Sequence, residues 1–294
     1  MIAYLYICSA SFLYNGSDTL LEVCEKLKKF SLLYDYVWEY HHDDNKFCIN
    51  PDQLSQILVY TGKTLSDILF NDQTPLCRQY RYLLLAALQK SISTKINTND
   101  DLCEYLSLES ADECQGIVVI NQQANIPICN QVFSSILGWM KFRRHFLAKY
   151  PQSPEFFITE AKKYFPKLHF SVNICNRLDE VLTTHSYSII NGLSLLNDYC
   201  HKEWQNYHGN DVAFIDYFAK KHGVNGSFEG KKNKQFNAIF KRDDDQTIEC
   251  YCEPHLKYNQ DDCGNKRQYM RIYFQHPNAS LDEKIYIGFI RKHI

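Results

Sequence analysis

The sequence predicts an α+β protein with a mixed α/β N-terminal region, a helical middle and a small antiparallel β-rich C-terminal module. Apolar, β-branched runs alternate with amphipathic segments in the first 132 residues. A helical period then continues to about Gly223. Short β-like runs separated by polar turns fill the last 45 residues. We therefore expect three regions, at residues 1–132, 133–226 and 227–294.

The N-terminal region is expected to open with a strand over residues 2–9, which are almost all apolar. Ser17 or Asp18 is positioned to cap a helix that runs roughly to Phe30. Five further elements follow: strands over 34–40 and 47–49, a helix beginning at Pro51, a helix over 80–91, and a buried strand over 116–120.

Helices are expected over residues 139–149, 155–164, 181–204 and 211–221, where apolar residues recur at helical spacing. The first is rich in Lys and Arg, including Arg143 and Arg144. We interpret that charge as a solvated outer helix face, with contact to a phosphate backbone as the alternative. Gly192 weakens the expectation that the third helix is unbroken, and Gly223 is expected to end the fourth. The Gly-, Asn- and Lys-rich stretch 224–235 is the clearest expected boundary.

Composition excludes several classes of protein. The 294 residues carry a formal net charge of −2, so no overall field draws the chain to nucleic acid or membrane. No apolar run reaches the length of a membrane span, and the N-terminus lacks the basic region of a signal peptide. We expect a cytoplasmic protein with no membrane partner. The chain has no P-loop, GxGxxG, GxSxG or HExxH motif and no CxxC pair among its twelve cysteines.

Chemically reactive side chains concentrate near the C-terminus. His255 and Lys257 are two residues apart, as are Arg271 and Tyr273, so each pair shares one face of a strand. A meander of these strands would bring the four residues together, with His293 near the end of the chain. Histidine, lysine, arginine and tyrosine can carry out metal-independent cleavage of RNA by acid–base catalysis. We predict that these five residues are catalytic and that no cofactor is needed.

In this prediction His255 is the general base or acid, and His293 is its possible partner. Lys257 and Arg271 hold and stabilise the phosphate, and Tyr273 stacks on the substrate or hydrogen-bonds to it. A local basic patch precedes the site, and we expect it to contact nucleic acid, with RNA favoured over DNA. Its predicted nucleic-acid-binding residues are Lys231, Lys232, Lys234 and Arg242.

The strings CEPHLK at 252–257, RIYF at 271–274 and IYIGFIRKH at 285–293 resemble the C-terminal signature of uncharacterised bacterial proteins associated with phage defence. The stretch 161–170 is similar to the same group. The compact β-hairpin ending also resembles RelE-like toxin ribonucleases. These resemblances imply a toxin-like role in antiviral defence and, as partners, the other proteins of a defence system.

Three alternatives remain open. Cys250, Cys252, His255 and Cys263 are zinc-competent residues within fourteen positions, although their spacing is unusual for a zinc site. Glu253 and Lys257, after the acidic turn 243–245, suggest a carboxylate nuclease, but with the wrong spacing. A non-enzymatic subunit of a multi-protein defence complex fits the helical middle and the near-neutral charge equally well.

Overall fold

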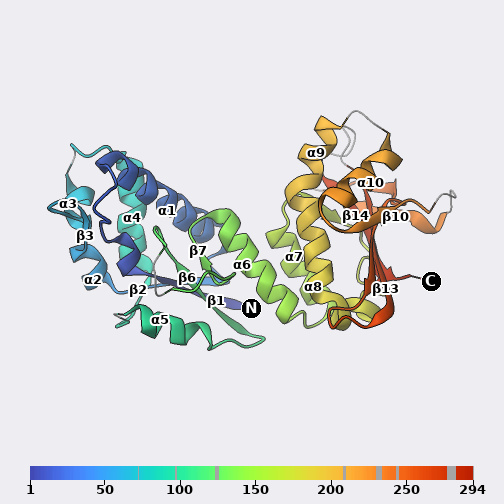
Figure 1. The fold of residues 1–294 in the computed structure, drawn as a ribbon, viewed down its shortest axis with the longest axis horizontal. Coiled ribbons are helices and arrows are strands. Elements are labelled where there is room, and N and C mark those ends of the chain that lie inside the picture. Colours follow the sequence, from blue (N-terminus) through green and yellow to red (C-terminus); the bar gives the residue numbers. More distant parts are fainter. Residues whose placement is uncertain are drawn as a thin grey trace. The chain divides into compact units, whose positions relative to one another are not determined.

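The computed structural model describes residues 1–71, 73–96, 98–122, 126–207, 210–229, 234–242, 245–276 and 283–293. The chain forms two compact units, Met1–Arg143 and Arg144–Ile294. Each unit has its own sheet and core (Figure 1). The α+β class is confirmed, with a helical middle and antiparallel strands near the C-terminus.

Unit 1 is built on a parallel sheet whose centre is β1 (Ile2–Ile7). This strand pairs with β2 (Asn45–Ile49) on one side and with β6 (Glu113–Val118) on the other. The edge strands β5 (Ile92–Ser93) and β7 (Val132–Phe133) complete the order β5-β2-β1-β6-β7. Parallel strands need crossover connections, and helices lie in the connections from β1 to β2, from β2 to β5 and from β5 to β6.

Helices cover both faces of this sheet. Tyr34 of α1 (Leu20–His41) lies on one face, with its ring centroid 4.8 Å from that of Phe47. On the opposite face, Leu102 of α5 (Asn99–Leu106) packs with Tyr6 and Ile117. The other elements of the unit are the 3₁₀ turn Ser9–Phe12, α2 (Pro51–Gln56), β3 (Leu58–Tyr60), β4 (Lys63–Thr64), α3 (Leu65–Phe70) and α4 (Arg78–Lys90). The helix α6 (Ile136–Lys149) begins in unit 1 and ends in unit 2.

The strand expected over residues 34–40 is wrong, because these residues form the second half of α1. The helix begins with a capping box in which Thr19 and Glu22 satisfy each other's backbone amides. Its buried side chains continue at helical spacing through Phe30, Tyr34 and Val37. Burial of this continuous stripe overrides the β-propensity of the aromatic residues. No helix among the described residues has the length and apolarity to cross a membrane.

Unit 2 is built on a mostly antiparallel sheet with the order β8-β14-β13-β12-β9. The three-strand meander expected near the C-terminus is confirmed, with β13 (Lys266–Gln275) pairing with both β12 (His255–Gln260) and β14 (Ile285–Lys292). One edge is β8 (Leu168–Phe170), parallel to β14, and the other is β9 (Asn225–Ser227). A separate hairpin joins β10 (Asn237–Lys241) to β11 (Thr247–Tyr251), after a 3₁₀ turn at Lys234–Phe236.

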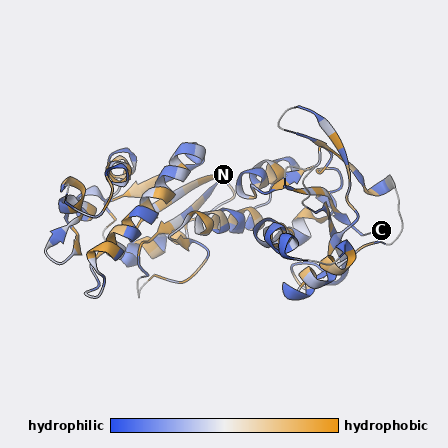
Figure 2. Ribbon diagram, turned by 90° about the horizontal axis from the view of Figure 1, so that it is seen from above, coloured by the Kyte–Doolittle hydropathy of each residue, from blue (hydrophilic) through white to orange (hydrophobic). Residues whose placement is uncertain are grey.

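Helices pack on one face of this sheet, and a β-hairpin packs on the other. Leu256, Ile272 and Ile290 point into a core that they share with α7 (Pro154–Tyr164), α8 (Asp179–Leu195) and α10 (Asp211–Lys221). Between α8 and α10 lie a π-helical turn at Leu196–Cys200 and α9 (His201–Asn206). On the outer face, away from the helices, the β10–β11 hairpin packs on Tyr273 and Tyr286. Figure 2 shows hydrophobic and hydrophilic residues interspersed along the helices, as expected where one helix face is buried and the other meets solvent.

The helical region and the β-rich module expected as separate domains therefore share one core. The stretch expected as a boundary, 224–235, contains β9, which pairs with β12 at the sheet edge. The composition of this stretch, rich in small and polar residues, resembles that of a linker. It contains a strand because its backbone hydrogen-bonds to β12, which composition does not predict. The expected long helix over 181–204 is interrupted at His185, which has a non-helical φ of −132°, and widens at Leu196–Cys200.

Gly192 lets α8 lie directly against the sheet. A Cβ at this position would be 2.5 Å from Cδ1 of Ile272 and 2.9 Å from the Tyr258 hydroxyl oxygen. We expect Gly192→Val to lower the free energy of unfolding of unit 2 by about 1–3 kcal/mol, since the added atoms overpack the core. Urea unfolding monitored by hydrogen exchange in unit 2 would measure it. Ser194→Val, on the same helix but half-buried, is the control, and equal losses in both variants would contradict this explanation.

Candidate functional site

The outer face of the unit 2 sheet gathers four of the five predicted catalytic residues. In the strand register His255 lies opposite Tyr273, and Lys257 lies opposite Arg271. On the next strand Arg291 lies opposite Arg271. Side chains two residues apart share a face. Since Leu256, Ile272 and Ile290 point toward the helices, these five side chains belong to the outer face.

His255 is held as a neutral imidazole. Its Nδ1 is 3.0 Å from the carbonyl oxygen of Glu253, which can only accept, so Nδ1 carries the proton. Its Nε2 therefore accepts from the Ser227 hydroxyl, 3.3 Å away. Burial lowers the pKa of His255 to about 4, with the charges of Lys257 and Arg271 acting in the same direction. The tautomer suits a general base, but the ring is only 1% exposed.

Glu229 links His255 to Tyr273. The Tyr273 hydroxyl donates to Oε1 of Glu229 at 3.2 Å, and the same oxygen lies 3.6 Å from Nε2 of His255. Burial and the Glu229 charge raise the pKa of Tyr273 to about 12, so Tyr273 remains a donor at neutral pH. The rings of His255 and Tyr273 are 4.8 Å apart. His255 and Tyr273 are the buried part of this polar cluster, and Glu229 connects them to the solvent-exposed surface.

Sequence reasoning missed Glu229 and Ser227, which complete this cluster. Both lie in the stretch that was expected to be a boundary. The detectable signal was the alternation of Asn225 and Ser227 around Gly226, which is typical of a strand with one polar face. Pairing of β9 with β12 places Ser227 opposite His255 and Asn225 opposite Lys257.

Two arginines extend the site across the sheet. Arg271 is buried, and its Nη1 donates to the carbonyl oxygens of Tyr258 and Met270 at 3.2 and 2.9 Å. Its Nε has no hydrogen-bond partner among the described residues, and burial lowers its pKa. The half-buried Arg291 lies with its guanidinium carbon 5.0 Å from the ring centroid of Tyr273 and 4.8 Å from that of Phe289. Such cation–π contacts orient the guanidinium without neutralising its charge.

Part of the site is open to solvent. Lys257 is half-buried and lines a groove of about 550 Å³ that also includes Asn225, Asn259 and Gln260. Tyr269, 40% exposed, lies beside Arg271, whose guanidinium carbon is 5.9 Å from its ring centroid. We call Lys257, Tyr269, Arg271 and Arg291 the outer-face patch. It combines three positive charges with an accessible aromatic ring.

His293 is on the same sheet but distant from His255. Its backbone amide donates to the Tyr269 carbonyl oxygen at 2.9 Å, which places it beyond the end of β14. His255 lies opposite Tyr273, four residues along β13 and on the other side of that strand. Ideal sheet spacings put the two backbones about 17 Å apart. The structure therefore does not bring His293 and His255 together as an acid–base pair.

The predicted nucleic-acid-binding residues are only partly described. Lys231 and Lys232 lie outside the described residues, as does the side chain of Lys234. Arg242 follows β10, and its backbone amide donates to the Gln246 carbonyl oxygen at 2.8 Å. The four zinc-competent residues are described, but no group of three or more potential metal ligands occurs in the described part of the chain. Of the acidic turn, residues 243 and 244 lie outside the described residues, and Asp245 pairs with Lys241 at 2.8 Å.

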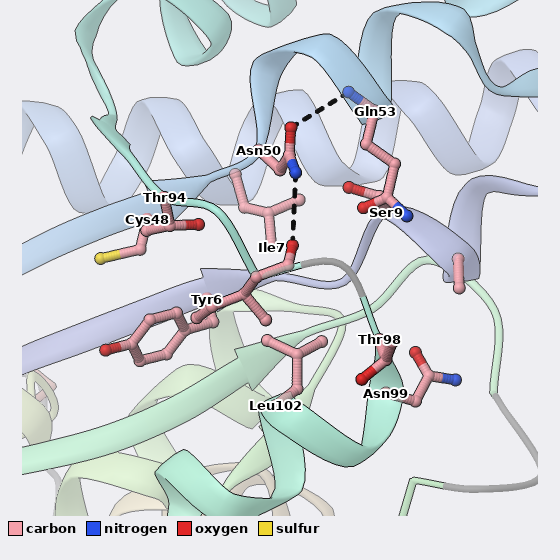
Figure 3. Close-up of a pocket in the computed structure, with 12 residues that line it drawn as sticks. Tyr6, Ile7, Ser9, Cys48, Asn50, Gln53, Thr94, Thr98, Asn99 and Leu102 are labelled. Atoms are coloured by element: carbon pink, nitrogen blue, oxygen red, sulfur yellow. Dashed lines mark hydrogen bonds between the residues drawn. The ribbon is translucent and has the colours of Figure 1, made fainter.

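Unit 1 has a polar cavity at the carboxyl ends of its parallel strands, the usual ligand position in such sheets. Figure 3 shows Ser9, Asn50, Thr94 and Asn99 around it. The Asn50 side chain accepts from the Gln53 backbone amide at 3.1 Å. The cavity measures about 10 Å³, which is about the room of one water molecule. Unit 2 therefore holds the stronger candidate site.

Comparison with protein-family models, with curated proteins and with solved structures found no match for this chain.

Proposed function

We propose that the protein is a toxin-like endonuclease of bacterial antiviral defence that acts on RNA in the cytoplasm, alongside other proteins of a defence system. The observation that carries this proposal is the outer-face patch, which shares its sheet face with a neutral histidine of defined tautomer. The defence role rests on the resemblance of the C-terminal strings, as does the RelE-like comparison.

RNA would bind along the outer face. Lys257 and Arg291 would contact successive phosphates, and Tyr269 would stack on an unpaired base. Arg271 lies behind them and adds positive potential. This mode of binding suits a single strand, because its bases are free to stack on a sheet surface.

Cleavage would begin when Nε2 of His255 takes the proton of a 2′-hydroxyl, which then attacks the adjacent phosphorus. That hydroxyl takes the position now held by the Ser227 hydroxyl, 3.3 Å from Nε2. Lys257 and Arg271 stabilise the charge that develops on the phosphate oxygens, and Tyr273 hydrogen-bonds to the substrate. Since His293 is distant, the Lys257 ammonium protonates the leaving 5′-oxygen.

One observation favours the alternative, a non-enzymatic interaction subunit of a defence complex. His255 is 1% exposed, and Arg271 and Tyr273 are also buried. Buried polar groups that satisfy one another commonly stabilise a fold. In this alternative the cluster supports the sheet, and the exposed side chains of the patch contact a protein.

We expect the double variant Lys257→Ala/Arg291→Ala to bind single-stranded RNA about tenfold or more weakly than wild type. The slope of log Kd against log salt concentration should fall by about 1.4, since two phosphate contacts to a single strand are lost. Fluorescence anisotropy with a labelled oligoribonucleotide measures both quantities. Lys220→Ala, which removes an exposed lysine paired with Asp216, is the control and should bind like wild type.

The same preparations test cleavage in EDTA, with His255→Gln beside them and circular dichroism to check its fold. Loss of cleavage in folded His255→Gln supports the acid–base mechanism. RNA binding that is equally strong in the double variant would refute the interface. An absence of both RNA binding and RNA cleavage in wild type would favour the interaction subunit, in which the patch contacts a protein.

A further inference from the structure

A second pocket in unit 2 lies at the opposite edge of the sheet from His255. It has a volume of about 670 Å³, which is in the range of small-molecule sites. Residues of α7, β8 and the segment after β8 form most of its wall, and Lys241 and Lys284 complete it. Three strand spacings, or about 14 Å, separate β8 from β12, the strand that carries His255. The pocket is therefore distinct from the proposed RNA-cleaving site.

Three lysines from distant parts of the sequence line this pocket. Lys162 is on α7, Lys241 ends β10 and Lys284 directly precedes β14, while Glu155 is the one carboxylate among the described residues that line the pocket. Lys241 also pairs with Asp245, but the two side chains are 62% and 84% exposed, so this ion pair is weak and easily displaced. The lining thus carries an excess of positive charge at a concave surface, which favours an anionic ligand.

The floor of the pocket is apolar and belongs to the unit 2 core. Ile158, Leu168, Phe170 and Ile174 are all buried there. The exposed Thr159 and the buried Ser171 also line the pocket and add polar residues to its wall. An apolar floor below a cationic rim suits a ligand with one apolar, flat part and one phosphate part.

Hydrogen bonds hold the wall in place. The Val172 amide donates to the Ile239 carbonyl oxygen at 2.9 Å, and the Ser171 hydroxyl donates to that of Gly288 at 2.7 Å. Nε2 of His169 lies 2.9 Å from the Lys241 carbonyl oxygen, and its ring is 5.0 Å from Tyr286. The segment after β8 is thus fixed to both β10 and β14. A wall fixed before binding lowers the entropic cost of ordering the site.

We propose that this pocket binds a nucleotide-sized phosphate ester, with its phosphate on Lys162, Lys241 and Lys284 and its base or other apolar part on the floor. The site does not depend on the proposed RNA cleavage. It gives unit 2 a small-molecule ligand in addition to the polymer proposed for the outer face.

Isothermal titration calorimetry of the full chain with adenosine monophosphate, inorganic phosphate and adenosine tests this proposal. We expect the nucleotide to bind about tenfold more tightly than either fragment. Lys162→Gln/Lys284→Gln should weaken nucleotide binding about tenfold, and Thr159→Trp should weaken it by filling the pocket while leaving the lysines in place. Lys220→Gln is the control and should bind like wild type.

Equal affinities for nucleotide and phosphate would overturn the proposal, as would nucleotide binding that neither pocket variant changes or no binding at millimolar concentration. RNA binding is measured on the same variants. Because Lys257 and Arg291 are intact in them, RNA affinity should equal that of wild type, and this separates the two proposals.

Discussion

Asp198→Ala is expected to lower the free energy of unfolding of unit 2 by about 3–5 kcal/mol, since it leaves the buried Arg144 guanidinium without its counter-charge. Arg144 is 2% exposed and forms a bidentate pair with Asp198, at 2.8 Å from Nη1 to Oδ2 and 3.1 Å from Nη2 to Oδ1. Its Nε donates to the Tyr164 carbonyl oxygen at 2.9 Å, and its guanidinium carbon lies 4.3 Å from the Phe165 ring centroid.

Urea unfolding followed by hydrogen exchange in residues 144–293 measures this loss separately from unit 1. Asp216→Ala, which removes an exposed carboxylate paired with Lys220, serves as the control and should cost about 0.5 kcal/mol. Replacing both partners, in Arg144→Met/Asp198→Leu, should recover most of the loss because no buried charge remains. A loss below about 1 kcal/mol in Asp198→Ala would show that water reaches and solvates the arginine.

Acidification from pH 7 to pH 5 is expected to destabilise unit 2 by about 2 kcal/mol through His255 alone. The pKa of His255 is about 4 in the folded chain and 6.5 in its ordinary state, so the unfolded chain binds the proton more tightly. The contribution of His255 to the free energy of unfolding is fully present above pH 6.5, and it falls progressively as the pH is lowered toward 4. The full loss would be about 3 kcal/mol.

His276 and His145 should also destabilise the folded chain as the pH falls, because burial lowers the pKa of each side chain. The His276 ring is stacked 4.6 Å from Trp204, and its Nε2 lies 3.7 Å from the Asp211 carboxylate, which opposes the shift. His276→Phe should therefore reduce the pH dependence while keeping the aromatic packing. Urea unfolding at pH 5, 6 and 7 measures these slopes. The same stability at pH 5 and pH 7 would mean that these rings are charged in the folded chain.

Several elements could be predicted from the sequence because their signals are local. The helix expected over 211–221 has those bounds in the structure, since Asn210 caps its first turn and Gly223, with a φ of +68°, follows its end. The pairing of His255 with Tyr273 and of Lys257 with Arg271 follows from two-residue alternation and short turns in a meander. Local spacing alone was sufficient to place these side chains on a common face.

Burial and partner choice depended on segments far away in the sequence. Arg143 and Arg144 were expected on a solvated helix face, but both are 2% exposed. Arg143 donates to the Met1 carbonyl oxygen at 2.8 Å, and Arg144 reaches Asp198. No periodicity within one helix distinguishes a buried, paired arginine from a solvated one, because the deciding partners lie about 50 and 140 residues away.

The candidate site also depends partly on local sequence signals and partly on non-local packing. The sequence by itself determined which residues share the outer sheet face, because strand alternation is a local geometric property. Only the tertiary structure decided that β9 brings Ser227 and Glu229 to His255, that the β10–β11 hairpin packs on Tyr273, and that His293 lies apart. These outcomes depend on which segments cover the face and in what register, and both are set by non-local packing.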